Sequence, residues 1–357
     1  MLRFSLRSCW LAALCALVLA GCVPGVNQPY PTFTPDRTLE AIPRMLTATS
    51  AAPTITPTVL RSPTPTRTLT PTPPQPGSPS LPGAQGERIP AGGAALTVLS
   101  ATAPETIGTL RRVEGTRYQN LEVIIENASE DTVEYNRLFF TLVGEEAQYE
   151  SLAQAAGPVL LSGTLRPGEW VRGHVAFAIP EEAEPLRLRY DPGVPDGQIW
   201  VRLEAEGDTN PAADAPVPAT GPLNGLPGPG ERVEASGLAL TVEQVNAAAR
   251  IPPARAEKGY IFVDLLVTIA NDGHDSAPFN AGYFRVKDAL GYEYTATSVP
   301  LETLIHAGSL GRNQRVQGHV IFQVPEDTQA LRLQYQPQVL AETYEPIQVA
   351  IEVPAAK

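Results

Sequence analysis

The stretch WVRGHVAFAIPEEAEPLRLRYDP at residues 170–192 decides the fold, and it returns as RVQGHVIFQVPEDTQALRLQYQP at 315–337. Apolar and polar side chains alternate along its first part, so that one face carries Val171, Val175, Phe177 and Ile179. A period of two is the pattern of a half-buried β-strand. Pro180 and Pro325 stand where these strands must end, because proline cannot donate to a strand ladder.

The repeat extends outward from this stretch in both directions. GERIPAGGAALTV at 86–98 returns as GERVEASGLALTV at 230–242, an offset of 144 residues. A strand ending at Asn127 returns as one ending at Asn271 with the same offset, whereas the long stretch returns after 145. Each copy is far longer than the unit of a solenoid, so each copy is predicted to be a domain.

The remaining segments of the first copy also alternate with a period of two, and no segment predicts a helix. Strands are expected at 95–101, 118–126, 137–143, 147–152, 169–179, 185–190 and 198–204. Seven short strands in about 120 residues, with turn residues between them, indicate a β-sandwich. The chain is therefore predicted to be all-β, with two tandem immunoglobulin-like β-sandwiches.

The motifs of the first copy resemble a bacterial family. Pro167-Gly168-Glu169 through Pro180 and the following L-x-L-x-Y-x-P are similar to extracytoplasmic domains of unknown function, related to the immunoprotective extracellular antigen of mycobacteria. The second copy departs at Gly311-Arg312-Asn313 but keeps Gly318 through Pro325. The resemblance implies a telokin-like, immunoglobulin-like fold in domains that commonly follow a lipid anchor, and it implies no particular function.

The N-terminus reads as an export signal. MLRFSLRS carries two arginines, and WLAALCALVLA at 10–20 is apolar but too short to span a bilayer. Leu19-Ala20-Gly21-Cys22 resembles the lipobox of bacterial lipoproteins, which implies cleavage before Cys22 and acylation of its thiol and amino group. The sequence thus predicts an exported protein, lipid-anchored to a membrane and facing its extracytoplasmic side.

Two segments rich in proline divide the chain further. TPTVLRSPTPTRTLTPTPPQPGSPSLPG is dominated by Thr, Pro and Ser, a composition that favours an extended, disordered tether. A second break, GDTNPAADAPVPATGPLNGLPGPG, separates the two copies. The predicted organisation is a signal peptide at 1–21, a tether at 22–85, a first sandwich at 86–204, a linker at 205–229 and a second sandwich at 230–353.

Charge and cysteine usage exclude several classes of function. Removing Arg3 and Arg7 with the leader leaves 24 basic residues against 38 acidic ones, a formal charge of −14. Such a surface disfavours nucleic acid as a partner. The cysteines are Cys9, Cys15 and Cys22, so the domains have no disulfide, thiol nucleophile or zinc–thiolate site.

No motif for hydrolysis, phosphate binding or metal binding occurs, and no cofactor is expected. His174 and His319 occupy matched positions on the polar face of the long strand, and local hydrogen bonding is favoured over catalysis for both. His274 and His306 are expected in loops. The paired acids Glu145-Glu146, Glu181-Glu182 and Asp191/Asp196 are interpreted as solvated turn residues rather than a glycosidase pair.

Four further positions are interpreted as structural. Asn127 lies in a glycosylation sequon, but Asn271 repeats without one, which favours an asparagine that shapes the turn after the strand. Gly173 and Gly318 face the predicted core, where a missing side chain indicates close packing.

Cations gather on the loop between the first two core strands of each copy, against the acidic background. These candidate anion- or partner-binding residues are Arg111, Arg112, Arg117, Arg250, Arg255 and Lys258. Ordinary solvated surface is the competing interpretation. If they bind, an anionic polymer or lipid headgroup of the cell envelope is the expected partner.

The sequence therefore favours a non-catalytic surface lipoprotein that presents two immunoglobulin-like domains for adhesion or for ligand or protein binding. Its partners would be the membrane, through Cys22, and an envelope polymer or another envelope protein. The alternatives are a structural or assembly lipoprotein of the cell envelope and, less favoured, an enzyme.

Overall fold

The computed structural model describes residues 75–184, 186–204, 223, 225–301, 303–339 and 342–356. The predicted signal peptide, Cys22, most of the predicted tether and most of the predicted linker lie outside the described residues. Within the described part, no helix has the length and apolar character that crossing a membrane requires.

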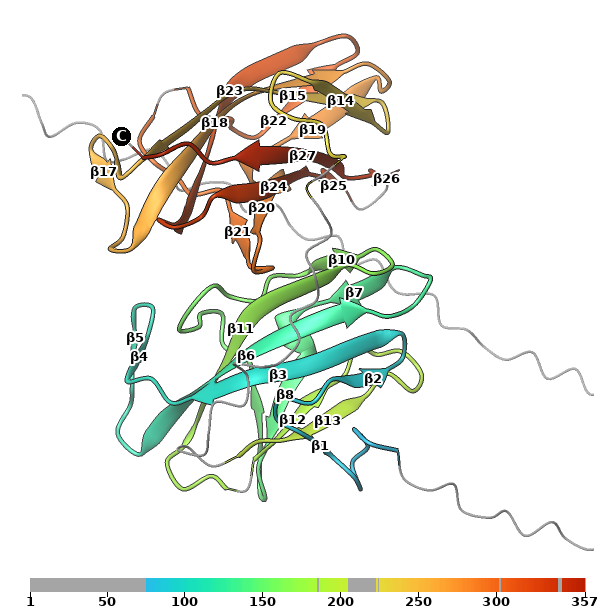
Figure 1. Cartoon of the computed structure of the whole chain (residues 1–357), viewed down its shortest axis with the longest axis vertical. Coiled ribbons are helices and arrows are strands. Elements are labelled where there is room, and N and C mark those ends of the chain that lie inside the picture. The colour runs from blue at the N-terminus through green and yellow to red at the C-terminus, as the bar shows by residue number, and fades with distance from the viewer. Residues whose placement is uncertain are drawn as a thin grey trace, which may run out of the picture. The chain divides into compact units, whose positions relative to one another are not determined.

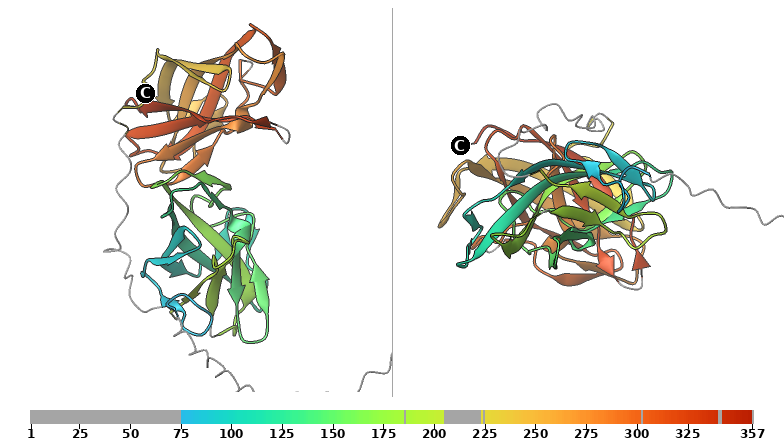
Figure 2. Two further views of the ribbon diagram at one scale, coloured as in Figure 1. Left: turned by 90° about the vertical axis from the view of Figure 1, so that its right-hand side faces the viewer. Right: turned by 90° about the horizontal axis from the view of Figure 1, so that it is seen from below.

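The first copy folds as two packed sheets (Figures 1 and 2). One sheet has the order β11-β6-β3-β2, formed by Trp170–Pro180, Thr116–Asn127, Ala94–Thr102 and Ile89–Ala91. The other has the order β1-β13-β12-β8-β9, formed by Gly83–Ala84, Ile199–Arg202, Arg187–Tyr190, Phe140–Val143 and Gln148–Glu150. Two short pairs flank them, β7–β10 (Val133–Tyr135, Gly163–Leu165) and β4–β5 (Thr106–Ile107, Leu110–Arg111).

The second copy repeats this plan. Its first sheet has the order β14-β15-β18-β23, formed by Arg232–Ala235, Leu238–Ala248, Tyr260–Asn271 and Arg315–Pro325. Its second sheet has the order β21-β20-β24-β27, formed by Glu293–Thr295, Phe284–Asp288, Ala330–Tyr335 and Ile347–Glu352. Three short pairs complete it: β16–β17 (Arg250–Ile251, Ala254–Arg255), β19–β22 (Ser276–Phe279, Gly308–Gly311) and β25–β26 (Gln338–Val339, Glu342–Thr343).

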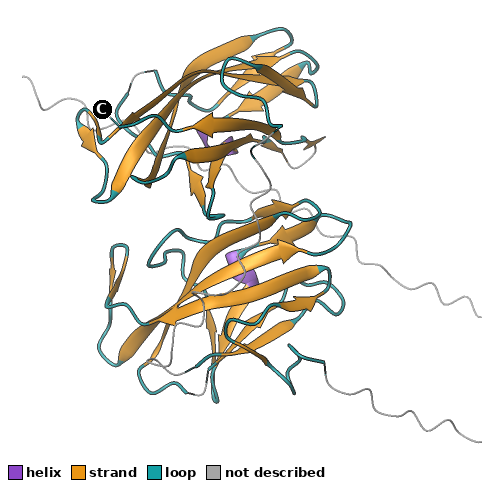
Figure 3. Ribbon diagram, viewed as in Figure 1, coloured by secondary structure: helices purple, strands orange, loops and turns teal. Residues whose placement is uncertain are grey.

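The predicted all-β class and the two sandwiches are confirmed (Figure 3). The long central strands bury alternate residues because one face of each sheet packs on the opposite sheet. Two single-turn 3-10 helices, η1 (Arg137–Phe139) and η3 (Ala281–Tyr283), were not predicted. Each is capped by an asparagine, Asn136 or Asn280, whose side chain accepts a hydrogen bond from the backbone two residues later.

Each sandwich has its own hydrophobic core. Phe140 and Tyr190 pack ring against ring in the first, with centroids 4.9 Å apart, and Phe284 and Tyr335 do so in the second at 4.5 Å. All four side chains are at most 1% exposed. The repeat in the sequence is therefore a repeat in packing.

The first sandwich begins before the predicted boundary at residue 86. Strand β1 pairs in parallel with β13, and the carbonyl of Gly77 accepts a hydrogen bond from the Trp200 amide over 2.8 Å. The end of the predicted tether thus belongs to the sandwich. The sequence did not predict this, because the segment is rich in proline and glycine. Backbone hydrogen bonds can hold a segment at a sheet edge even when few of its side chains reach the core.

The backbone of another segment packs closely against Gly173 and Gly318 at the edge of each sheet, which agrees with their predicted packing role. In the first copy, Leu160 N donates to His174 O over 3.0 Å, and a Cβ on Gly173 would stand 2.6 Å from Leu160 Cα. In the second, a Cβ on Gly318 would stand 2.8 Å from Thr303 O. Only glycine leaves room for backbone this close.

The asparagines at the ends of the long strands hold the turns that follow. Asn127 Nδ2 donates to Asp131 O and Leu165 O, at 2.6 and 2.8 Å, and Asn127 Oδ1 accepts from Ser129 N. Asn271 is bonded in the same way and is fully buried. The interpretation of Asn127 as a turn residue is therefore supported by its contacts.

Candidate functional site

The predicted basic loop of the first sandwich contains the hairpin β4–β5, which projects from the sheets in Figure 1. Arg111 ends β5 and is exposed. Arg112 lies 3.7 Å from Glu105 and 3.6 Å from Glu181, and Arg117 lies within strand β6 rather than in the loop. Arg117 is largely buried and donates to Gln119, Glu184 and the Ala183 carbonyl.

The predicted basic loop of the second sandwich contains the matching hairpin β16–β17. Arg250 and Arg255 are direct cross-strand partners in it, and Lys258 follows three residues later. All three side chains are exposed. The structure thus pairs Arg250 with Arg255 on one hairpin, three residues before Lys258. In the first sandwich Arg111 and Arg112 stay at the hairpin, whereas Arg117 lies in strand β6.

The matched histidines have different environments. His174 Nδ1 lies 3.2 Å from the Pro158 carbonyl oxygen, whereas His319 Nδ1 lies 2.7 Å from Asp264 Oδ1. Asp264 escaped notice in the sequence because it sits on the neighbouring strand β18, two residues from the direct partner of His319. Within the described residues, no three His, Cys, Asp or Glu side chains are grouped so as to hold a metal ion.

The acid pairs are turn residues. Glu145, Glu146, Glu181 and Glu182 are exposed, and Asp191 accepts hydrogen bonds from the Gly193 amide and the Gln198 side chain. Asp196 adopts φ +54°, a left-handed conformation that aspartate tolerates in turns. None of them forms a facing pair in the cleft described below.

The turn between β20 and β21, residues 288–292, contacts strand β11 of the first sandwich; we call these contacts the joint. Arg172 N donates to Gly291 O, and Lys287 Nζ donates to Trp170 O, both over 3.0 Å. Gly291 adopts φ +85°, and a Cβ there would lie 2.1 Å from the Trp170 ring. The turn therefore needs glycine both for its conformation and for its approach to the indole.

A half-buried ionic network forms the centre of the joint. Arg172 donates through Nε and Nη2 to Glu122 Oε1, over 2.7 and 2.6 Å, and the Tyr292 hydroxyl donates to the same carboxylate. The guanidinium lies 4.9 Å from the centroid of the Tyr292 ring, and His174 stacks on that ring with an interplanar angle of 4°. Charge-assisted hydrogen bonds and a cation–π contact thus link the turn to two strands of the first sandwich.

These contacts shift the protonation equilibria at the joint. Burial lowers the pKa of His174 below its ordinary value, because the charged imidazolium loses hydration. Burial alone would raise the pKa of Glu122, but the Tyr292 hydrogen bond and the charge of Arg172 outweigh it and lower that pKa. At neutral pH these shifts favour a neutral His174 side chain and a charged Glu122 carboxylate.

Further ion pairs stand at the edges of the joint. Glu293 accepts from the Tyr135 hydroxyl at 2.6 Å and lies 3.2 Å from Lys287 Nζ. Arg332 Nη1 donates to Glu169 Oε1 over 3.0 Å. The sequence did not predict these pairs at the edges of the joint. Tyr135–Glu293 and Glu169–Arg332 join residues that are more than 115 positions apart, and Lys287–Glu293 flanks a turn that has no motif.

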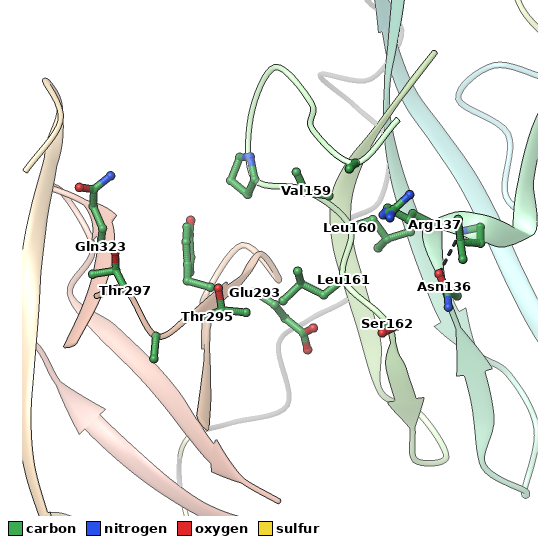
Figure 4. A pocket seen from close by; sticks show the side chains of 15 residues that line it. Asn136, Arg137, Val159, Leu160, Leu161, Ser162, Glu293, Thr295, Thr297 and Gln323 are labelled. Atoms are coloured by element: carbon green, nitrogen blue, oxygen red, sulfur yellow. Dashed lines mark hydrogen bonds between the residues drawn. The ribbon is translucent and has the colours of Figure 1, made fainter. Parts of the chain in front are cut away.

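A cleft of about 610 Å³ opens beside the joint. Figure 4 shows side chains of both sandwiches along its walls. It is lined by Asn136, Arg137, Leu138, Ala153, Pro158, Val159, Leu160, Leu161, Ser162, Glu293, Tyr294, Thr295, Ala296, Thr297 and Gln323. The walls thus mix backbone, hydroxyl and amide groups with apolar side chains.

Comparison with known protein families gives two matches, at residues 84–199 and 228–347. The matched segments contain 116 and 120 residues, together 236 of 357. Both match the domain of unknown function DUF4352. The chain belongs to the DUF4352 family. No curated protein matches it.

Several solved structures are similar to a DUF4352 domain of this chain. The yjhA protein of Bacillus subtilis is 24% identical, with a TM-score of 0.29, and the match covers 34% of this chain and 98% of that one. The secreted protein MPT63 of Mycobacterium tuberculosis is 12% identical, with a TM-score of 0.27, over 35% of this chain and 94% of that one. The two family matches confirm the extracytoplasmic domain of unknown function that the motifs resemble.

The two DUF4352 domains differ at the joint. In the first, a β-bulge between Val98 and Ser100 turns Leu99 outward, where it is buried with Ile124 and Trp170. The bulge recurs in the second domain between Val242 and Gln244. There the positions matched by the repeat hold Glu243, Thr268 and Arg315.

The hairpin that forms the joint also differs between the domains. Four residues, 144–147, connect β8 and β9, whereas five, 288–292, connect the paired ends of β20 and β21. This insertion is why the repeat offset changes from 144 to 145. The first turn carries Glu145-Glu146, and the second carries Leu290-Gly291-Tyr292. Only the second domain therefore has a turn that fits against an indole.

Proposed function

We propose that this DUF4352 protein is a non-catalytic binding protein, lipid-anchored at Cys22 and facing the extracytoplasmic side, that takes its ligand in the cleft beside the joint. The observation that carries the proposal is a 610 Å³ cleft with walls from both domains. Ligand sites are commonly concave, of this size and at domain boundaries.

The chemistry of the cleft supports binding rather than catalysis. Its carboxylate, Glu293, is already engaged by Tyr135 and Lys287. Arg137 donates to the Leu152 carbonyl, and the Gln323 side chain accepts from the Glu257 amide. These groups are held in place by neighbours, so the cleft offers a fixed surface with hydroxyl groups at Ser162, Thr295 and Thr297 for a polar ligand.

Filling the cleft tests the proposal. Thr295 is exposed within the cleft on β21, and Thr164 is exposed on β10 outside it. We expect Thr295→Trp to reduce crosslinked capture of the ligand from intact cells by at least about tenfold, because an indole occupies a large share of the cleft. Thr164→Trp is the control and should capture as the wild type does. Equal capture by both variants would place the ligand elsewhere.

Anchoring is tested separately. We expect Cys22→Ser to release the protein into the soluble fraction or to block its processing, because serine lacks the thiol to which the lipid would be attached. Membrane retention together with normal cleavage would contradict the anchor. Loss of anchoring leaves the cleft intact, so the two parts of the proposal fail independently.

A further inference from the structure

We propose that the β16–β17 hairpin of the second domain is a binding site for phosphate groups, of the kind that anionic phospholipid headgroups carry. The site consists of Arg250, Arg255 and Lys258. None of the three lines the cleft. The inference therefore does not depend on the ligand of the cleft.

The hairpin is held in a fixed conformation. Ile251, Ala254 and Ala256 pack against a buried cluster of Phe262, Val299 and Ile321. The Ala256 amide donates to the Ala249 carbonyl over 3.1 Å, which closes the base of the hairpin. The arginines at its two strands are therefore presented by a rigid element rather than by a loop.

The two arginines face each other. Arg250 and Arg255 are paired across an antiparallel ladder, so their side chains leave the same face with Cβ atoms about 5 Å apart. Like charges directly opposite each other are destabilising. Among the described residues no carboxylate lies within ion-pair distance of Arg250, Arg255 or Lys258, and no side-chain hydrogen bond engages them. A bound anion would relieve the repulsion.

The first domain shows how the same hairpin looks when it is neutralised. Its cations Arg112 and Arg117 are paired with Glu105, Glu181 and Glu184. The positions matched to Glu105 and Glu184 hold Ala249 and Gln329 in the second domain. Thr106 and Glu114 are matched by Arg250 and Lys258. Ala256 and Ile261 in turn replace Arg112 and Arg117, so each domain has three cations here. The second domain lacks the acids Glu105, Glu114 and Glu184, keeps Glu326 at the position of Glu181 and adds Glu257.

The chemistry of the site fits phosphate. Guanidinium groups form a planar fork that binds phosphate oxygens in pairs, and an ammonium adds a point charge. Within 249–261, three cations stand against the single acid Glu257, a net charge of +2. The hairpin tip between the arginines is Ile251-Pro252-Pro253-Ala254, and both prolines are exposed. Two exposed prolines flanked by cations match the boundary between headgroups and acyl chains, which favours a lipid surface.

Vesicle binding tests the site on the unlipidated chain that begins at residue 22 and carries Cys22→Ser, because a lipid anchor would hide the effect. The probes are vesicles of phosphatidylcholine with and without phosphatidylglycerol. We expect flotation only with phosphatidylglycerol, weakening as salt rises from 50 to about 300 mM because exposed charges are screened. Replacing Arg250, Arg255 and Lys258 by glutamine should lower the partition coefficient at least about tenfold.

The first domain supplies the control. Replacing Arg112 by glutamine should change the partition coefficient by less than about twofold, because Arg112 is already paired with Glu105 and Glu181. Inorganic phosphate should compete at low salt. Equal binding by the two variants, no binding to phosphatidylglycerol vesicles, or binding to soluble polyphosphate but not to vesicles would each overturn the proposal.

Discussion

The two DUF4352 domains share a core and differ on their surfaces. The same glycines, asparagines and ring pairs recur inside both, because both must close the same two sheets. Outside, the first domain has an apolar cluster of Leu99, Ile124 and Trp170 at the joint, and the second has Glu243, Thr268 and Arg315 at the matched positions. A duplicated fold thus kept its packing while each copy acquired a different set of contacts.

The two domains also differ in the sheet face that corresponds to the joint. The turn of the second domain contacts the first, but the matched face of the second is polar, with Thr268 Oγ1 donating to Glu243 Oε1 over 2.9 Å. A third domain with the same turn would have no apolar cluster to cover there. The charged face is therefore compatible with solvent, as exposed sheet faces generally are.

The shared core predicts the largest effects, equal in both domains. Gly173→Ala and Gly318→Ala should each lower the free energy of unfolding of their own domain by about 2 kcal/mol, because the new methyl group overlaps backbone of the crossing segment. Chemical denaturation resolved by domain measures this. Gly144→Ala is the control, since its Cβ would have no contact closer than 3.5 Å. An effect in one domain alone would contradict the shared packing.

The joint predicts an effect confined to one domain. Arg172→Ala should lower the free energy of unfolding of the first domain by roughly 2 kcal/mol, because Glu122 keeps its half-buried charge without its partner. Gln317 occupies the matched position in the second domain, and Gln317→Ala should cost less than about 0.5 kcal/mol. Equal losses would show that the joint contributes nothing.

Gly291 tests the contact itself. Gly291→Ala and Gly259→Ala both place a side chain at φ above +80°, but only Gly291 approaches Trp170. With Trp10 and Trp200 replaced by phenylalanine, acrylamide quenching of Trp170 should rise at least about twofold in Gly291→Ala, because Trp170 is only 4% exposed at the joint. Gly259→Ala should leave quenching unchanged, and a rise in both variants would indicate backbone strain alone.

Acid should weaken the first domain at the joint by a smaller amount. The pKa of His174 is lowered in the folded protein, so the unfolded chain binds more protons as pH falls below the ordinary value of 6.5. Stability is thus full above that pH and declines toward the folded pKa. Between pH 7.5 and 5.5 we expect a loss of up to about 1 kcal/mol in the first domain. His174→Gln should remove this slope, and an unchanged slope would assign it elsewhere.

The smallest effect concerns the facing arginines. Arg255→Gln should raise the free energy of unfolding of the second domain by a few tenths of a kcal/mol at low salt, because it removes a cross-strand repulsion. Arg111→Gln, at the matched position of the first domain, should change nothing measurable. Denaturation at low and high salt distinguishes the two. A loss of stability in Arg255→Gln would mean that its stem packs on the hairpin.

The sequence by itself determined the class of the fold, the two domains and the roles of Gly173, Gly318, Asn127 and Asn271. These features follow from alternation along the chain and from the repeat, which are local or periodic signals. Only the tertiary structure decided which charges are free, because Arg112 and Arg117 are neutralised by acids that are distant in sequence or unremarkable in pattern. It also decided the joint and the cleft: Glu122, Arg172 and Tyr292 carry no motif, and their meeting depends on one inserted residue in a hairpin turn.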